Sequence, residues 1–81
     1  MVSPNPFTDY LHVYINAEEQ CAAQIRIADN SGKIMESRKV TLANGANQID
    51  LMNLDYLASG VYNVSITTDK WTQTEKIVKI N

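Results

Sequence analysis

The side chains best suited to chemistry in this sequence are its single histidine, His12, and its single cysteine, Cys21. A thiol beside an imidazole can act as a nucleophile with its base. Apolar and polar residues alternate around both positions, and this alternation turns Cys21 toward the core and His12 toward solvent. We therefore interpret Cys21 as a small core residue and His12 as a solvated strand residue. One histidine excludes a metal site built from several histidines, and one cysteine excludes an intrachain disulfide.

Acidic side chains are the next candidates for chemistry. The run from Asp29 to Gly32 has the composition of the start of a calcium loop, but the further oxygen ligands and the closing glutamate of such a loop do not follow. It predicts a hairpin turn, in which the aspartate bonds nearby backbone and the glycine is left-handed. Asp50, Asp55 and Asp69 fall in separate turns or strand ends, without the spacing of paired catalytic carboxylates. The sequence thus predicts no enzyme, no cofactor and no metal site.

Three aromatic residues suggest a binding surface. Tyr10, Tyr14 and Trp71 could form an exposed platform for a sugar or a peptide if their strands are neighbours, because a flat apolar face favours stacking. Scattered surface aromatics are the alternative interpretation. A carbohydrate-binding or adhesion module of a surface protein therefore remains an alternative function.

Composition limits the remaining possibilities. With 81 residues, 44% of them hydrophobic and 20% charged, the chain has room for one globular domain at residues 1–81 with one small core. Seven basic and nine acidic residues give a net charge of -2, which is no footprint for nucleic acid or for an anionic membrane. The sequence contains no membrane-spanning run and no N-terminal export signal, so an extracellular destination would require a signal on a longer precursor.

Alternating residues define the elements that would position these side chains. They predict strands at 9–16, 21–28, 33–42, 47–51, 60–68 and 71–80, with the third in one or two pieces, and an irregular crossover at 52–59 that carries Leu54 and Leu57 toward the core. The positions that alternation turns inward are Leu11, Val13 and Ile15 in the first strand, Ala23, Ile25 and Ile27 in the second, and Tyr62, Val64 and Ile66 in the strand at 60–68. Short strands joined by Gly, Asn and Asp turns, without a helix, indicate a single immunoglobulin-like antiparallel β-sandwich of about seven strands. In the last strand Ile77 and Val78 are adjacent, and we expect Val78 and Ile80 to be the buried pair.

Residues 57–66 are the feature around which this sandwich is organised. Gly60 precedes the strand and indicates a bend with a positive φ or a close backbone approach. Tyr62 follows two residues later, where its ring can be buried while its hydroxyl reaches the turn backbone. This is the chemistry of the tyrosine corner of immunoglobulin-like sandwiches.

The motifs also form an ordered set. They begin with the Pro-Asn-Pro-Phe run that ends at Phe7 and finish with the strand at the C-terminal end. The residues that carry the pattern are Pro4, Asn5, Pro6, Asp29, Gly32, Gly45, Asn47, Gly60 and Tyr62. In this order and spacing they resemble the type A C-terminal sorting domain of the type IX (Por) secretion system of Bacteroidetes. One departure is Ser3, where the family often has an aromatic residue.

The resemblance implies a non-catalytic address label at the end of a longer secreted precursor. Such a domain folds as an immunoglobulin-like sandwich in the periplasm. The type IX translocon and its outer-membrane shuttle protein then recognise it, and the cargo passes to the outer-membrane surface or the medium. A sortase-like cysteine peptidase usually removes the domain and joins the cargo to anionic lipopolysaccharide. The resemblance places the cleavage upstream of Pro4.

The last strand is our hypothesis for the recognition element. Its end, beside the C-terminus, could present an unpaired edge for strand addition by a receptor, with two lysines setting the orientation. The residues proposed to be recognised are Lys76, Val78, Lys79, Ile80 and Asn81. The alternative, that these residues only close the sheet, remains open.

Overall fold

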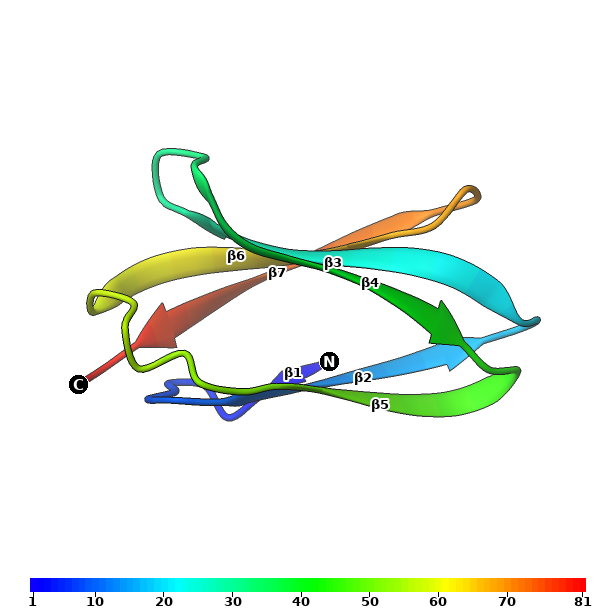
Figure 1. Ribbon diagram of the computed structural model, residues 1–81, viewed down its shortest axis with the longest axis horizontal. Helices are drawn as coiled ribbons and strands as arrows, with labels where there is room; N and C mark the ends of the chain where they lie inside the picture. Colours follow the sequence, from blue (N-terminus) through cyan, green and yellow to red (C-terminus); the bar gives the residue numbers. More distant parts are fainter.

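The computed structural model describes residues 1–81 as two antiparallel β-sheets that face each other, with no helix (Figure 1). The three-stranded sheet has the order β1 (Val2–Ser3), β2 (Leu11–Ala17), β5 (Gly45–Leu51), and the four-stranded sheet has the order β4 (Ile34–Leu42), β3 (Cys21–Asp29), β6 (Gly60–Thr67), β7 (Thr72–Lys79). The predicted all-β sandwich of about seven short strands is confirmed.

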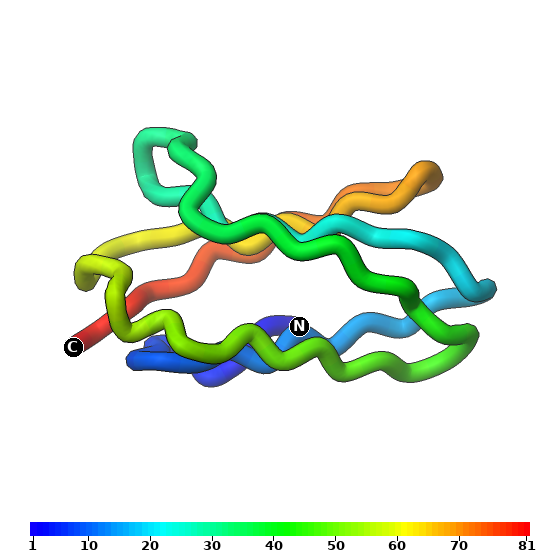
Figure 2. The backbone as a smooth tube through the Cα atoms, in the orientation of Figure 1, coloured from blue at the N-terminus to red at the C-terminus, as the bar shows by residue number.

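The chain passes between the two sheets three times, as its path in Figure 2 shows. It crosses at residues 18–20, at residues 43–44 and along the segment 52–59, whereas the β3–β4 and β6–β7 hairpins stay within the four-stranded sheet. The third predicted strand is one piece, β4, with a bulge opposite Ile27 and Ala28. The sequence did not predict β1, a two-residue strand whose Val2 is buried.

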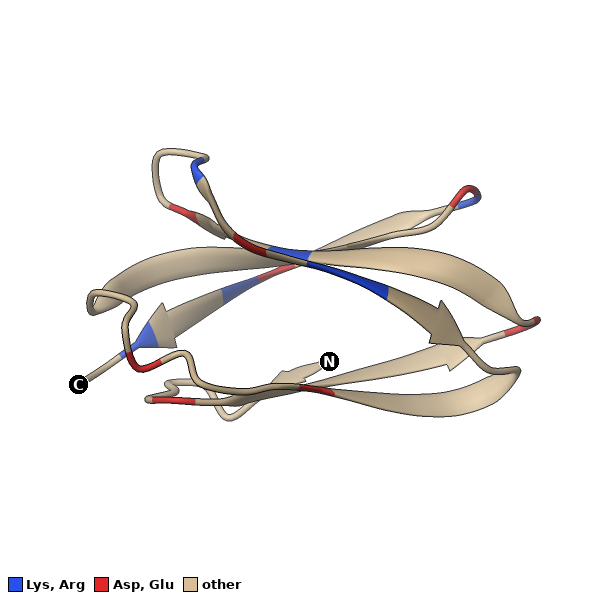
Figure 3. Cartoon of the chain, viewed as in Figure 1, with Lys and Arg blue, Asp and Glu red and all other residues tan.

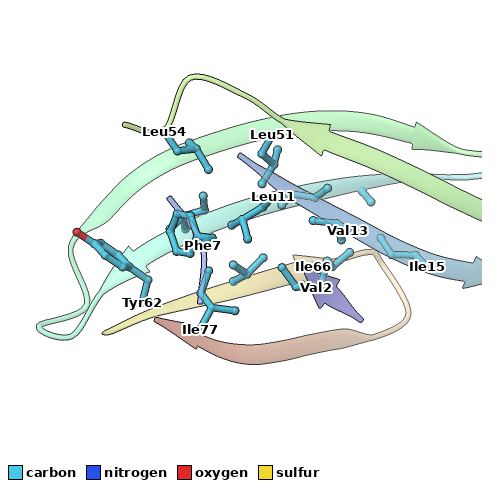
Figure 4. Packing of buried hydrophobic residues seen from close by; sticks show 14 of the residues in the cluster. Val2, Phe7, Leu11, Val13, Ile15, Leu51, Leu54, Tyr62, Ile66 and Ile77 are labelled. Carbon is cyan, nitrogen blue, oxygen red and sulfur yellow. The ribbon is translucent and has the colours of Figure 1, made fainter. Parts of the chain in front are cut away.

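The core lies between the sheets and contains 17 buried apolar residues (Figure 4). The predicted inward positions are confirmed: Leu11, Val13 and Ile15 on β2, Ala23, Ile25 and Ile27 on β3, and Tyr62, Val64 and Ile66 on β6. Leu54 and Leu57 enter the core from the crossover, as expected. Cys21 is partly buried and packs against this cluster, which agrees with its interpretation as a small core residue.

The register of the last strand differs from the prediction. Ile77 is 0% exposed and Lys79 is 4% exposed, whereas Val78 and Ile80 are 40% and 48% exposed. The expectation that Val78 and Ile80 form the buried pair is therefore wrong. Directly opposed residues on antiparallel strands share a face, and Ile77 is opposite the buried Tyr62. Pairing with β6 therefore sets which side of β7 faces inward. The sequence pattern did not indicate this side, because the residue two positions after Ile77 is a lysine.

Two polar motifs shape the ends of the strands as the sequence predicts. The Tyr62 hydroxyl donates to the Ala58 carbonyl at 2.5 Å, and Gly60 has a φ of +154°, which favours glycine. These two residues form the tyrosine corner. In the β3–β4 turn, Asp29 Oδ1 accepts from the backbone N–H groups of Ser31 and Lys33, both at 2.9 Å.

The turn between β4 and β5 is built by Asn47. Its Oδ1 accepts from the N–H of Ala43 at 2.8 Å, and its Nδ2 donates to the carbonyls of Ala43 at 2.9 Å and Gly45 at 3.1 Å. One side chain thereby bonds the backbone on both sides of the chain reversal. This explains why an asparagine two residues after Gly45 belongs to the motif set.

Candidate functional site

The structure separates the two residues that could have formed a thiol–imidazole pair. His12 lies on β2 in the three-stranded sheet, whereas Cys21 begins β3 in the four-stranded sheet and packs against the core. The partner of His12 is instead Asp50 on the neighbouring strand, with Nδ1 2.7 Å from Oδ1. No group of three or more His, Cys, Asp or Glu side chains is arranged to hold a metal ion.

The outer face of β2 gathers two of the three predicted aromatic residues. The ring of His12 lies between those of Tyr10 and Tyr14, with centroid distances of 5.0 Å and 6.2 Å. Trp71 is not among them, because it precedes β7 in the other sheet and packs against the core. The predicted platform of Tyr10, Tyr14 and Trp71 is therefore not formed, since its strands are not neighbours.

Hydrogen bonds to nearby groups lower the pKa values of two acidic side chains. A hydrogen bond from Ser31 and a backbone bond from Lys33 lower the pKa of Asp29, and bonds from Gln48 and His12 lower the pKa of Asp50. Asp29 therefore holds its turn, as predicted. Asp50 on β5, Asp55 in the crossover and Asp69 in the β6–β7 turn lie in separate elements. These three carboxylates are not brought together as a catalytic pair.

One tyrosine from the crossover reaches the edge of the four-stranded sheet. The hydroxyl of Tyr56 donates to the Met35 carbonyl at 3.2 Å and also bonds the Glu36 carboxylate. The bond to Glu36, reinforced by desolvation, raises the pKa of Tyr56 to about 12. Glu36 also pairs with Arg38 at 3.3 Å. This cluster ties residues 52–59 to the β4 edge.

The last strand makes a contact that the sequence did not predict. β7 is an edge strand, and the segment Pro4–Phe7, here called the PNPF segment, lies against its C-terminal end. The N–H of Phe7 donates to the Val78 carbonyl and the N–H of Ile80 donates to the Phe7 carbonyl, both at 2.9 Å. Asn5 Oδ1 accepts from the N–H of Val78 at 3.0 Å. The first and last motifs of the set therefore form one structural unit.

Phe7 anchors this unit in the core. Its side chain is buried, and its ring meets that of Tyr62 edge to face, with centroids 6.4 Å apart and an interplanar angle of 67° (Figure 4). The peptide bonds before Pro4 and Pro6 are both cis. The PNPF segment, the tyrosine corner and the end of β7 therefore share one region of the molecule.

The residues proposed for recognition fall into two groups. Lys76, Val78, Ile80 and Asn81 are exposed. Lys79 is buried, and its Nζ donates to the Ile80 carbonyl at 3.4 Å. The backbone groups of Val78 and Ile80 are already bonded to the PNPF segment, so the strand is not an open edge at its C-terminal end.

The two sheets differ in charge. All seven Lys and Arg residues lie on the four-stranded sheet and its turns, interspersed with acidic residues, whereas residues 1–20 and 43–59, which include the three-stranded sheet, carry acidic residues only (Figure 3). No helix of the length and apolarity needed to cross a bilayer occurs. The described polar clusters hold turns, corners and strand ends, and the fold and its side chains define a small immunoglobulin-like β-sandwich.

Comparison with protein families identifies the family to which this sandwich belongs. A family model described as a secretion system C-terminal sorting domain matches residues 1–81, the whole chain, and the chain belongs to this family. It is a C-terminal sorting signal for type IX secretion, and the match does not favour a carbohydrate-binding or adhesion module. Domains of this family are generally non-catalytic. A comparison with curated proteins found no match for the chain.

Proposed function

We propose that residues 1–81 form the end of a longer secreted precursor and carry its cargo to the type IX machinery. The single observation that supports this proposal is the match of the whole chain to the sorting-domain family. In this proposal the precursor reaches the periplasm, where the domain folds. The translocon and its outer-membrane shuttle protein then recognise the folded domain, and the cargo passes to the cell surface or the medium.

A sortase-like cysteine peptidase is the proposed partner that removes the domain after export. Peptidases cleave exposed and extended chain, not paired strands. Val2 is buried and its strand β1 pairs with β2. We therefore place the cleavage upstream of Val2, ahead of the folded domain.

The residues proposed to be recognised are Lys76, Val78, Lys79, Ile80 and Asn81. Exposure of the apolar side chains of Val78 and Ile80 beside the exposed Lys76 supports this assignment, because exposed apolar groups next to a charge are typical of contact surfaces. The burial of Lys79 indicates a different part for this residue: its alkyl chain, and not its ammonium, supports the end of β7.

The test is surface delivery of a reporter that carries an N-terminal export signal and residues 1–81 at its C-terminal end, in a host with type IX secretion. Deleting residues 76–81 would also remove the buried Ile77, so single substitutions are the sharper probe. Ile80→Asn should reduce delivery. Ile34→Asn is the matched control, because Ile34 is 50% exposed on the opposite edge strand and Ile80 is 48% exposed.

Two outcomes would contradict the proposal. Equal delivery of Ile80→Asn and the unaltered domain would remove Ile80 from the recognition surface. Failure of the unaltered domain to deliver the reporter in the competent host would contradict the sorting function itself. A melting temperature measured for each purified variant separates loss of recognition from loss of folding.

A further inference from the structure

The edge of β7 is divided into a covered part and an open part. Along an antiparallel edge strand, every second residue directs its N–H and C=O away from the neighbouring strand. Val78 is such an outward residue, because both of its backbone groups bond to the PNPF segment. Counting back by twos, Lys76, Thr74 and Thr72 also present their backbone groups outward.

These three residues have no backbone partner on their outer side. The hydrogen bonds outside the paired strands include those of Phe7 with Val78 and Ile80 but none to the outward backbone groups of Thr72, Thr74 or Lys76. Their side chains are exposed as well. The open stretch spans about 17 Å at the usual rise of a strand.

The N-terminal strand passes close to this stretch without covering it. The N–H of Val2 bonds Glu75 Oε2 at 3.0 Å. Beside this contact the surface is hollowed, and the hollow is lined by Met1, Ile66, Gln73, Thr74 and Glu75. This hollow adjoins the open edge at Thr74.

The opposite edge of the same sheet has a different character. Three of the four residues from Glu36 to Lys39 on β4 are charged. In addition, the hydroxyl of Tyr56 bonds the carbonyl of Met35 on this edge. Charges on an edge strand discourage pairing with another chain. The run Thr72–Thr74 on β7 carries no charge and contains strand-favouring threonines.

The backbone of another segment already bonds part of the β7 edge. Phe7 forms an isolated parallel bridge with Lys79 at the C-terminal end of this edge. We propose that the open stretch Thr72–Lys76 is the docking edge for an extended segment of the secretion machinery, which adds to the sheet as a further strand. This inference rests on the proposed function and places main-chain recognition ahead of Val78.

A proline placed at an outward position tests the proposal directly. Thr74→Pro removes an N–H that points to solvent and leaves the bonds to β6 in place, which an edge strand tolerates. The matched control is Lys39→Pro. The alternation of inward and outward backbone groups can be followed from β7 through its pairing with β6, then with β3, to β4. It gives Lys39 an N–H that points outward on the opposite edge of the sheet.

The assay is the surface delivery of the reporter fused to residues 1–81. Thr74→Pro should reduce delivery about tenfold or more, because it removes a main-chain bond and its ring obstructs the added strand, whereas Lys39→Pro should deliver normally. Normal delivery of a folded Thr74→Pro domain would overturn the proposal. Failure of the unaltered domain would instead contradict the sorting function.

Two measurements on the purified, unaltered domain complete the test. Amide hydrogen exchange at Thr72, Thr74 and Lys76 should be fast in the free domain and slow in complex with the purified translocon and shuttle protein. Binding without that protection would overturn the proposal, even if Thr74→Pro fails to fold. Sedimentation is the second measurement. A dimer with these amides already protected would assign the edge to a second copy of the chain and would also overturn it.

Discussion

The hydroxyl of Tyr62 provides a way to separate folding from recognition. It donates to the carbonyl of Ala58 at 2.5 Å, while the ring of Tyr62 is buried against Phe7. Tyr62→Phe removes only the oxygen. Ala58 is exposed, so its carbonyl can bind water in the variant. The cost should therefore be that of a net hydrogen bond, about 1 kcal/mol, without the larger penalty of a buried unsatisfied acceptor.

Thermal unfolding of the purified domain measures this cost. For a domain of this size, 1 kcal/mol corresponds to a fall in melting temperature of about 4–8 °C. Tyr14→Phe is the matched control, because Tyr14 is exposed and its hydroxyl makes no hydrogen bond. Its melting temperature should be unchanged. Surface delivery of the reporter should remain normal for both variants at a temperature where both are folded.

Two results would refute the reasoning about the corner. An unchanged melting temperature for Tyr62→Phe would mean that the bond to Ala58 does not stabilise the fold. A normal melting temperature together with failed delivery would mean that the corner itself is the sorting signal, and recognition would then have to be moved away from β7.

Three further predictions concern the ends of the strands. Lys79→Met should keep both melting temperature and delivery, because Nζ bonds only the Ile80 carbonyl; lost delivery would show that this ammonium is recognised. Asn5→Ala should speed amide exchange at Val78 and cost about 1 kcal/mol, and unchanged exchange would contradict the clamp. Because the native turn lowers the pKa of Asp29 below 3.8, its stabilisation is present above that pH and is lost as the pH falls through the lowered value. The melting temperature of Asp29→Asn should therefore fall less steeply with decreasing pH than that of the unaltered domain. Parallel curves of melting temperature against pH for the two proteins would contradict this role of Asp29.

Local patterns in the sequence predict the sandwich well. Alternation correctly assigned the inward faces of β2, β3 and β6, and the chemistry of Gly60 and Tyr62 predicted the corner. These features depend on residues that are close in sequence. Turn residues such as Asp29 also act on backbone only two to four positions away.

Features that depend on distant residues were not predicted. Asn5 and Val78 are separated by 73 positions, and nothing local to either one indicates their bond. The face of β7 is set by its pairing with β6, so the adjacent Ile77 and Val78 gave no answer. Trp71 likewise faces the core because of where its hairpin packs. The open part of the β7 edge could not be predicted either, because the PNPF segment that covers the rest of this edge is distant from β7 in sequence.

The most direct measurement is the surface-to-periplasm ratio of the reporter fused to residues 1–81, compared between a type IX-competent host and the same host without its translocon. The chain should place the reporter on the surface only in the competent host, and Thr74→Pro should hold it in the periplasm while Lys39→Pro does not. Surface delivery without the translocon, or none in the competent host, would contradict the account.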